Sequence, residues 1–342
     1  MNRRTFLKGV GTAAAVVPVA GCSPLRGKTA GYKPKGVMPK KTLGKTGIEV
    51  SMLGFGSHLV KDLIAKPELR DSMIKLGFEG GINTFDVYDH AGYKQFEPMS
   101  KSIQDFRKDV VVSLVAVKPT EEMQAEIDST LAVFRTDYID LYRVQSINDN
   151  RIRILEKNRD AGKIRKIGIV SHDANLMMGF IDTYRNVLDY VMIVYNFHHN
   201  MGRPGGGETW PGNDYAALIP RCGSLGLGII GIKPMGSDDM IALARKKGFF
   251  KDRRGSIARA MLRSVYQAPE IHCTMPAMNS MDEVITNLES AYYPALSDIE
   301  RTMLSELSRE ADALKGAYLR PHYRWLENWA LRTAGAVVGQ QT

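Results

Sequence analysis

Residues 138–170 read YIDLYRVQSINDNRIRILEKNRDAGKIRKIGIV. Two runs in this stretch, 138–144 and 167–170, are rich in apolar and β-branched residues and predict buried strands. Between them, residues 151–161 place apolar side chains at three- and four-residue spacing among polar ones, which is typical of an amphipathic helix. A strand, a helix and a second strand in this order predict two parallel strands joined by a right-handed crossover.

The same alternation continues along the chain. Eight such units in about 250 residues favour a (β/α)8 barrel of the α/β class. An open doubly wound sheet is the alternative, but no Gly-x-Gly-x-x-Gly sequence follows the first strand. Two later helices, at 299–314 and 322–334, are expected to cover the barrel. The predicted strands are 52–56, 82–86, 110–117, 138–144, 167–170, 190–195, 228–232 and 272–275, and predicted helices include 67–78, 120–134, 151–161, 215–224 and 256–266.

The composition is that of a globular protein. The 342 residues are 44% hydrophobic and 24% charged, which is enough apolar material for one large barrel. The body of the chain has no run of 18 apolar residues, so no bilayer-spanning helix is expected there. Much of the formal net charge of +9 lies before the first strand. We therefore expect no nucleic-acid partner, because this excess fits a solvated tether near anionic lipid better.

The first residues look like an export address. Arg3 and Arg4 precede a short apolar run at 10–20, and Val19-Ala20-Gly21-Cys22 follows. This order resembles a twin-arginine signal ending in a lipobox, with an ordinary amphipathic helix as the alternative. It implies a signal peptide at 1–21, lipidation of Cys22, a basic tether at 22–40 and anchoring to a membrane at its periplasmic face. The last residues, 336–342, are expected to form a flexible tail.

Four segments in order resemble the aldo-keto reductase family. They are LGKTGIEVS at 43–51, GINTFD at 81–86, TDYIDLY at 136–142 and GKIRKIGIVS at 162–171. The resemblance implies a barrel over 41–335 with an N-terminal β-hairpin and C-terminal capping helices. It also implies an NADP- or NAD-dependent oxidoreductase acting on a small carbonyl compound.

Most of the family's catalytic residues are replaced. In that chemistry a tyrosine protonates the carbonyl oxygen while nicotinamide gives a hydride to the carbon. A lysine and an aspartate lower the pKa of that tyrosine, and a histidine orients the carbonyl. Asp86 stands at the aspartate position, but the tyrosine, lysine and histidine positions are Ala91, Val115 and Gln145. Only one of the four family residues is kept.

Substitutes for the proton donor follow Asp86 in the same loop. His90 and Tyr93 are the first candidates, so the predicted catalytic set is Asp86, His90, Tyr93 and Gln145. Lys118 lies about 10 Å further along an extended chain than Val115, too far to serve as the lysine.

The positions that contact the nucleotide in the family are better preserved. No Lys or Arg lies between Pro276 and Asn287, so a 2′-phosphate lacks a cation there and NAD and NADP both remain open. These positions could also serve folding alone. The predicted contacts are Ser171 and His172 to the nicotinamide amide, Tyr195 stacking on the nicotinamide, Lys233, Pro234, Met235 and Gly236 beneath the pyrophosphate, and Glu283 and Asn287 at the adenine.

Five of the seven histidines follow predicted strands, where a barrel has its active-site mouth. They are His58, His90, His172, His198 and His199. A polar pocket for a small molecule is the main interpretation, and no spacing matches a recognised zinc motif, so no metal is assigned. The sequence thus predicts a divergent oxidoreductase. The alternative is a non-catalytic or metal-dependent barrel that binds a small molecule in the same pocket.

Overall fold

A computed structural model of the protein describes residues 32–56, 63, 65–87, 95–171, 174–198, 215–236, 238–249 and 254–314. The chain divides into two compact units, Met1–Tyr32 and Lys33–Thr342. Of the first unit only Tyr32 is described, so the predicted signal peptide and Cys22 lie outside the described residues, as do His90, Tyr93 and His172.

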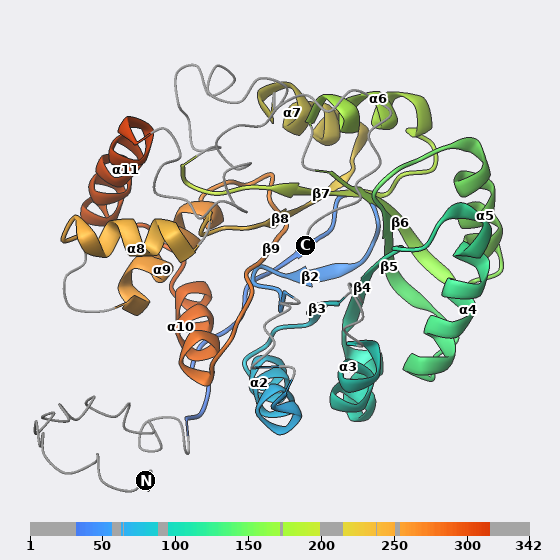
Figure 1. The fold of residues 1–342 in the computed structure, drawn as a ribbon, viewed down its shortest axis with the longest axis horizontal. Coiled ribbons are helices and arrows are strands. Elements are labelled where there is room, and N and C mark those ends of the chain that lie inside the picture. Colours follow the sequence, from blue (N-terminus) through green and yellow to red (C-terminus); the bar gives the residue numbers. More distant parts are fainter. Residues whose placement is uncertain are drawn as a thin grey trace, which may run out of the picture. The chain divides into compact units, whose positions relative to one another are not determined.

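Seven parallel strands form one sheet in chain order, and the helices lie outside the ring of strands (Figure 1). Each neighbouring pair is parallel, as expected for strands that alternate with helices. The strands are β3 (Thr84–Val87), β4 (Val111–Val115), β5 (Ile139–Val144), β6 (Ile164–Val170), β7 (Tyr190–Val194), β8 (Gly228–Ile232) and β9 (Cys273–Met275).

Residues 53–56 close the ring between its two ends. Leu53 bridges Thr274 of β9, Gly56 bridges Ala277 just after it, and Phe55 bridges Phe85 of β3. These contacts are isolated bridges, so the predicted strand at 52–56 is less regular than expected. Gly56 lets the backbones approach, because a Cβ there would lie 2.7 Å from the carbonyl oxygen of Pro276. The (β/α)8 barrel is confirmed, with this segment as its first strand.

The predicted helices are present, with small changes at their ends. For example, the helix expected at 151–161 begins at Asp149, because the Asn148 side chain accepts a hydrogen bond from the Arg151 N–H and caps it. Within the described ranges, no helix is long and apolar enough to cross a membrane. The helices are α2 (Pro67–Glu79), α3 (Phe96–Ile103), α4 (Met123–Phe134), α5 (Asp149–Asp160), α6 (Ala174–Tyr184), α7 (Tyr215–Leu225), α8 (Asp238–Lys246), α9 (Arg254–Tyr266), α10 (Met281–Tyr292) and α11 (Asp298–Ala313), with 3-10 turns η1 (Gln104–Asp109) and η2 (Thr120–Glu122).

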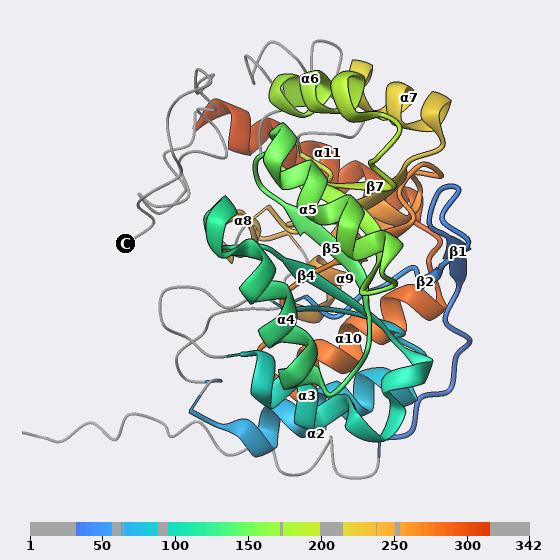
Figure 2. The same cartoon turned by 90° about the vertical axis from the view of Figure 1, so that its right-hand side faces the viewer.

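An antiparallel hairpin of β1 (Lys40–Thr42) and β2 (Glu49–Ser51) covers the amino-terminal end of the barrel (Figure 2). Its Leu43, Ile48 and Val50 belong to the same buried cluster as Tyr190 and Ile230 from the barrel strands. The hairpin predicted from the sequence is therefore confirmed. The hairpin closes the amino-terminal end of the barrel. The mouth, at the carboxyl ends of the strands, lies at the opposite end.

The chain packs on the barrel slightly before the boundary predicted at residue 41. Met38 is buried, and the Pro39 carbonyl accepts the N–H of Met52. Gly36 lies so close to the ring of Tyr292 that any Cβ would overlap it. The last residues assigned to the tether are thus part of the folded unit.

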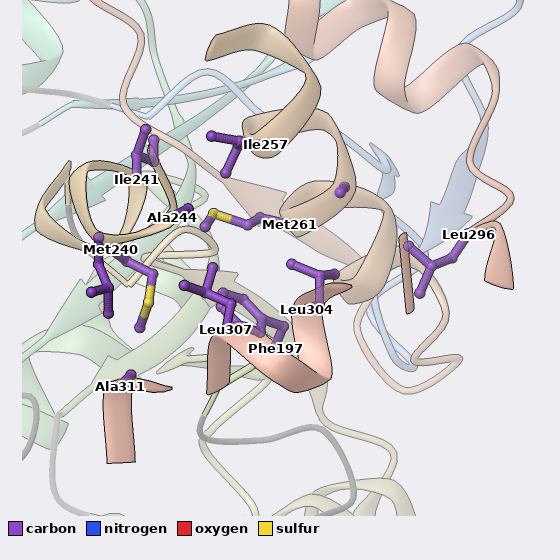
Figure 3. Close-up of a cluster of buried hydrophobic side chains, with 12 residues drawn as sticks. Phe197, Met240, Ile241, Ala244, Ile257, Met261, Leu296, Leu304, Leu307 and Ala311 are labelled. Atoms are coloured by element: carbon purple, nitrogen blue, oxygen red, sulfur yellow. The ribbon is translucent and has the colours of Figure 1, made fainter. Parts of the chain in front are cut away.

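Helix α11 covers α8 and α9 on the outside of the barrel (Figure 3). Its Leu304, Leu307 and Ala311 pack against Met240 and Met261. A capping box of Ser297 and Glu300 starts the helix one residue before the predicted bound. The first predicted capping helix is confirmed, and the second, at 322–334, lies outside the described residues.

Candidate active site

Asp86 lies inside the barrel and is held by two neighbours. One of its carboxylate oxygens accepts hydrogen bonds from Arg143 Nη1 at 2.5 Å and from Ser113 Oγ at 2.8 Å. The other accepts from Arg143 Nη2 at 3.1 Å. Arg143 Nη1 also donates to Ser113 Oγ at 2.8 Å. The three side chains form a closed polar network on β3, β4 and β5.

Both charged members of this network are buried. Asp86 is 5% exposed and Arg143 is 3% exposed. A buried charge is tolerated when it is paired and its hydrogen bonds are satisfied, and the two-bonded contact between guanidinium and carboxylate meets that condition. The pair therefore fixes the orientation of the one catalytic residue that the chain shares with the family pattern.

The arginine takes the place of the missing lysine. Val115, at the lysine position, is buried, and its register partner on the next strand is Arg143. Both residues face the interior, because Val111, Ser113 and Val115 alternate on β4 as Leu141 and Arg143 do on β5. The cation near Asp86 is thus present, on the neighbouring strand.

Arg143 was not among the residues predicted for the site. A signal was available, because an arginine in an interior-facing position of an otherwise apolar strand needs a buried partner. The family pattern pointed instead to Val115, the partner of Arg143 on β4, and to Gln145, two residues after Arg143.

Tyr190 bounds the network on the side of β6 and β7. Its ring lies over Gly168, where a Cβ would overlap the ring. Burial raises the pKa of the Tyr190 hydroxyl, and the nearby Arg143 charge opposes that rise. Because Tyr190 is 0% exposed, its hydroxyl cannot serve as the proton donor to a substrate at the mouth.

Two other residues considered for catalysis lie at the mouth. Gln145 follows β5 directly and is exposed, so its amide is available to a ligand. Lys118 is exposed, and its Nζ lies 3.5 Å from a carboxylate oxygen of Glu122. Lys118 therefore faces another partner, in line with the expectation that it cannot replace the lysine.

The turn after β8 contains the predicted pyrophosphate contacts. Lys233 adopts a left-handed backbone (φ 54°), and the Gly236 N–H donates to the Lys233 carbonyl at 2.9 Å. Pro234 is buried, and Met235 packs against the cluster under α11. Burial lowers the pKa of the Lys233 amine to about 8. This turn places a cationic group at the carboxyl end of a strand, where barrels bind phosphates.

The start of α10 carries the predicted adenine contacts. Ser280 Oγ accepts the N–H of Glu283, and the Glu283 carboxylate accepts the N–H of Asn279 at 2.7 Å. Two buried polar atoms here, Asn279 Oδ1 and Asn287 Nδ2, have no hydrogen-bond partner among the described residues. Such atoms are costly to bury unless something else bonds them. They suit the hydrogen-bonding edge of a bound base.

Two of the residues predicted to contact nicotinamide, Ser171 and Tyr195, are described by the structure. Ser171 follows β6 directly and is partly buried. A Cβ built on Gly231 would lie 3.4 Å from the Cβ of Tyr195. Gly231 faces the outer side of β8, because its neighbours Ile230 and Ile232 face the interior. Burial raises the pKa of Tyr195 to about 12. The strand alternation directs Tyr195 away from the mouth, so this placement does not support stacking on nicotinamide.

His198 is not part of the mouth. It is 0% exposed, and its Nδ1 lies 2.9 Å from Ser308 Oγ on α11. Its Nε2 lies 4.0 Å from a carboxylate oxygen of Asp312. Its position after a strand suggested a pocket residue, but the helix that covers it makes it a packing residue. The other four histidines predicted at the mouth lie outside the described residues. Within the described part of the chain, no group of three His, Cys, Asp or Glu could hold a metal.

No protein-family profile matches the chain. It is 25% identical over 293 residues to L-galactose dehydrogenase of Arabidopsis thaliana, covering 77% of this chain and 82% of that protein. It is 25% identical over 172 residues to aldo-keto reductase YhdN of Bacillus subtilis (strain 168), covering 44% of this chain and 51% of YhdN.

Solved structures show the same fold. The holo and apo forms of aldo-keto reductase AKR11C1 from Bacillus halodurans superpose with TM-scores of 0.60 and 0.58 at 19% identity. Each comparison covers 79% of this chain and 96% of AKR11C1. The barrel and these relatives support membership of the aldo-keto reductase family of oxidoreductases.

Proposed function

We propose that the chain is an exported, lipid-anchored oxidoreductase that binds NADP or NAD and acts slowly on small carbonyl compounds. The observation that carries the nucleotide half is a pair of buried atoms, Asn279 Oδ1 just before α10 and Asn287 Nδ2 within it, that have no hydrogen-bond partner among the described residues. Asn287 is 2% exposed, so water does not readily satisfy it. A bound base offers these atoms the donor and the acceptor that they lack.

Several residues suit the rest of a dinucleotide. The Lys233 ammonium would attract the pyrophosphate, while Pro234, Met235 and Gly236 shape the turn beneath it. Ser171 would hold the nicotinamide amide, with His172 beside it in sequence. A bound reduced nicotinamide supplies hydride to an electrophilic carbon.

The catalytic half explains why the reaction should be slow. Reduction builds negative charge on the carbonyl oxygen, which needs a hydrogen-bond donor and then a proton. The Gln145 amide can donate a hydrogen bond at the mouth, but it cannot give up a proton. Arg143 directs both terminal nitrogens to Asp86, and Tyr190 is too deep. His90 and Tyr93 remain the proposed acids.

The location is proposed from the sequence alone. The arginine pair and the apolar run before Cys22 support export by the twin-arginine route, which moves folded proteins. Acylation at Cys22 would then tether the barrel at the periplasmic face of a membrane. One lipid chain binds a membrane only weakly, so the diacyl form that a lipobox implies matters for stable attachment.

The second candidate is a non-catalytic or metal-dependent barrel that binds a small molecule in the same pocket. Its support is the replacement of three of the four family catalytic residues at Ala91, Val115 and Gln145. The two candidates differ in nucleotide binding and in turnover, so measurements of both separate them.

Calorimetric titration tests the proposal directly. The full chain carrying Cys22→Ser, which prevents acylation, would be titrated with NADPH and with NADH. We expect binding of at least one of the two, weakened about tenfold or more by Asn287→Ala, since a lost buried hydrogen bond costs about 1–3 kcal/mol. Asn150→Ala, at the exposed start of α5, is the matched control. No binding of either nucleotide would reject the proposal in favour of the second candidate.

A further inference from the structure

We propose that Arg143 is the positioning residue of this active site, supplying from β5 the charge that pairs with Asp86 and fixes its orientation. It stands in for a lysine at Val115 on β4, the strand next to it. The inference rests on the proposed function only for its catalytic readout, because the ion pair itself exists without a bound nucleotide.

The register of the strands makes this substitution possible. Val115 and Arg143 are paired residues on adjacent strands and face the same interior. A long side chain from either position can therefore approach the carboxylate on β3. Arg143 does so past Ser113, whose hydroxyl lies within 2.8 Å of both partners.

The barrel interior is shaped to direct the guanidinium toward β3. On the other side of Arg143, its register partner is Gly168, and the ring of Tyr190 occupies the space above that glycine. The ring closes the route toward β6 and β7. Asp86 and Ser113 lie on the opposite side and accept hydrogen bonds from the two terminal nitrogens of the guanidinium.

Removing Arg143 would leave Asp86 in an unfavourable state. The carboxylate is 5% exposed, and its other hydrogen-bond donor among the described residues is the hydroxyl of Ser113. A single hydroxyl does not offset the cost of burying a negative charge, so the carboxyl would take up a proton or the strands would shift. Either change alters the electrostatic field at the mouth of the barrel. Arg143 therefore acts on the site through Asp86.

An arginine changes the chemistry that the pair can perform. Its guanidinium holds both carboxylate oxygens at once and does not lose its proton in proteins. The pair can therefore orient neighbouring groups and provide a fixed field, but it cannot pass a proton along. Proton transfer must come from a different side chain at the mouth.

The test compares Arg143→Met with the double variant Arg143→Met/Val115→Lys, which moves the cation back to β4. Infrared spectra at neutral pH report a protonated carboxyl without any bound nucleotide. We expect such a band in Arg143→Met, its disappearance when Asp86→Asn is added, and its loss in the double variant. Arg143→Lys should keep Asp86 ionised and covers the case in which Arg143→Met does not fold.

The catalytic readout is the rate of nicotinamide oxidation in a single turnover with an aldehyde in excess. Arg143→Met should slow it about a hundredfold, as misplacement of a catalytic group does, and the double variant should recover part of the loss. The control is Arg107→Met, which breaks a second buried ion pair, to Asp140 at 2.9 Å, outside the barrel interior. It should lower stability without changing this rate.

The outcomes separate the two proposals. If the wild type binds no nucleotide, the proposed function fails, while the infrared spectra still decide the role of Arg143. An ionised Asp86 in Arg143→Met, or a double variant that behaves like Arg143→Met in the infrared spectra, would overturn the positioning role.

Discussion

The guanidinium of Arg143 holds both carboxylate oxygens of Asp86, at 2.5 and 3.1 Å, and so joins β5 to β3 across the strand between them. This contact lies at the one position of the chain that was predicted to keep a catalytic residue of the aldo-keto reductase pattern. The charge pattern of the site is therefore kept although the lysine position is a valine. What differs is the strand that carries the cation.

The ion pair should contribute strongly to stability. Arg143→Met should lower the free energy of unfolding by about 3–5 kcal/mol, because it leaves a buried carboxylate without its counter-charge. Replacing both residues, as Asp86→Leu/Arg143→Met, should recover much of the loss. Urea unfolding at low and high salt would measure this, and the loss should change little with salt because the pair is buried. A loss under about 1 kcal/mol, typical of an exposed pair, would contradict the buried geometry.

The Lys233 amine should make nucleotide binding depend on pH. Burial lowers its pKa to about 8, so below pH 8 the free protein already carries the charge that attracts phosphate. Above pH 8 binding must take up a proton, and affinity should fall by up to about tenfold per pH unit. A plot of nucleotide affinity against pH, from neutral to alkaline, would bend near pH 8 in the wild type. It would bend likewise in Lys118→Met, a control at the mouth. A bend that persists in Lys233→Met would assign it to another group.

The same shift has a consequence for folding. The lowered pKa means that, between about 8 and the ordinary 10.5, the unfolded chain binds a proton at Lys233 that the folded chain does not. This group should therefore make the protein more stable as the pH rises through that window. Lys233→Met should remove that rise, as measured by unfolding at several pH values. An unchanged pH dependence would show that other residues dominate.

His198 should affect packing and not ligand binding. Its ring is buried against Ser308 of α11, so His198→Ala should cost about 1–3 kcal/mol of stability through the lost hydrogen bond and contacts. Nucleotide affinity, measured by calorimetry well below the melting temperature, should stay within a factor of about two. A large loss of affinity with little loss of stability would return His198 to the mouth.

Cys22 should determine the location of the protein in the cell. Fractionation of the wild type should recover a membrane-bound protein that lacks residues 1–21, and Cys22→Ala should accumulate as a precursor without the acyl group. Mass spectrometry of the N-terminal peptide would identify the modification. A wild type found soluble with residues 1–21 still attached would exclude the lipoprotein interpretation.

The barrel could be predicted from the sequence because its signals are local. The unit at 138–170 contains two apolar strands and an amphipathic helix, and those elements appear as β5, α5 and β6. The first strand was harder to delimit, since Gly54 and Gly56 allow close approach of Cys273, Met275 and Pro276 but leave few side chains to form a pattern. Two of its three bridges depend on partners, Thr274 and Ala277, more than 200 residues later in the chain.

The site could be predicted only in part. A family pattern names the position of the lysine, whereas a residue at another position can supply the same positive charge. Val115 suggested that the cation was lost, whereas the register between β4 and β5 brings Arg143 to the same place. His198 seemed suited to the pocket from its place after a strand, yet a helix 110 residues later covers it. Both outcomes depend on contacts between distant parts of the chain, which periodicity does not encode.

The most direct test of the central claim is to follow nucleotide binding and oxidation in one preparation. Fluorescence of NADPH or NADH mixed with the full chain carrying Cys22→Ser reports binding, and its decay after addition of an aldehyde reports hydride transfer. We expect a clear binding signal, weakened with Asn287→Ala, followed by oxidation far slower than the roughly 1 per second or faster of typical enzymes. The absence of a binding signal with both nucleotides would contradict the proposed nucleotide site, and turnover at ordinary enzyme rates would contradict the proposed loss of catalytic power.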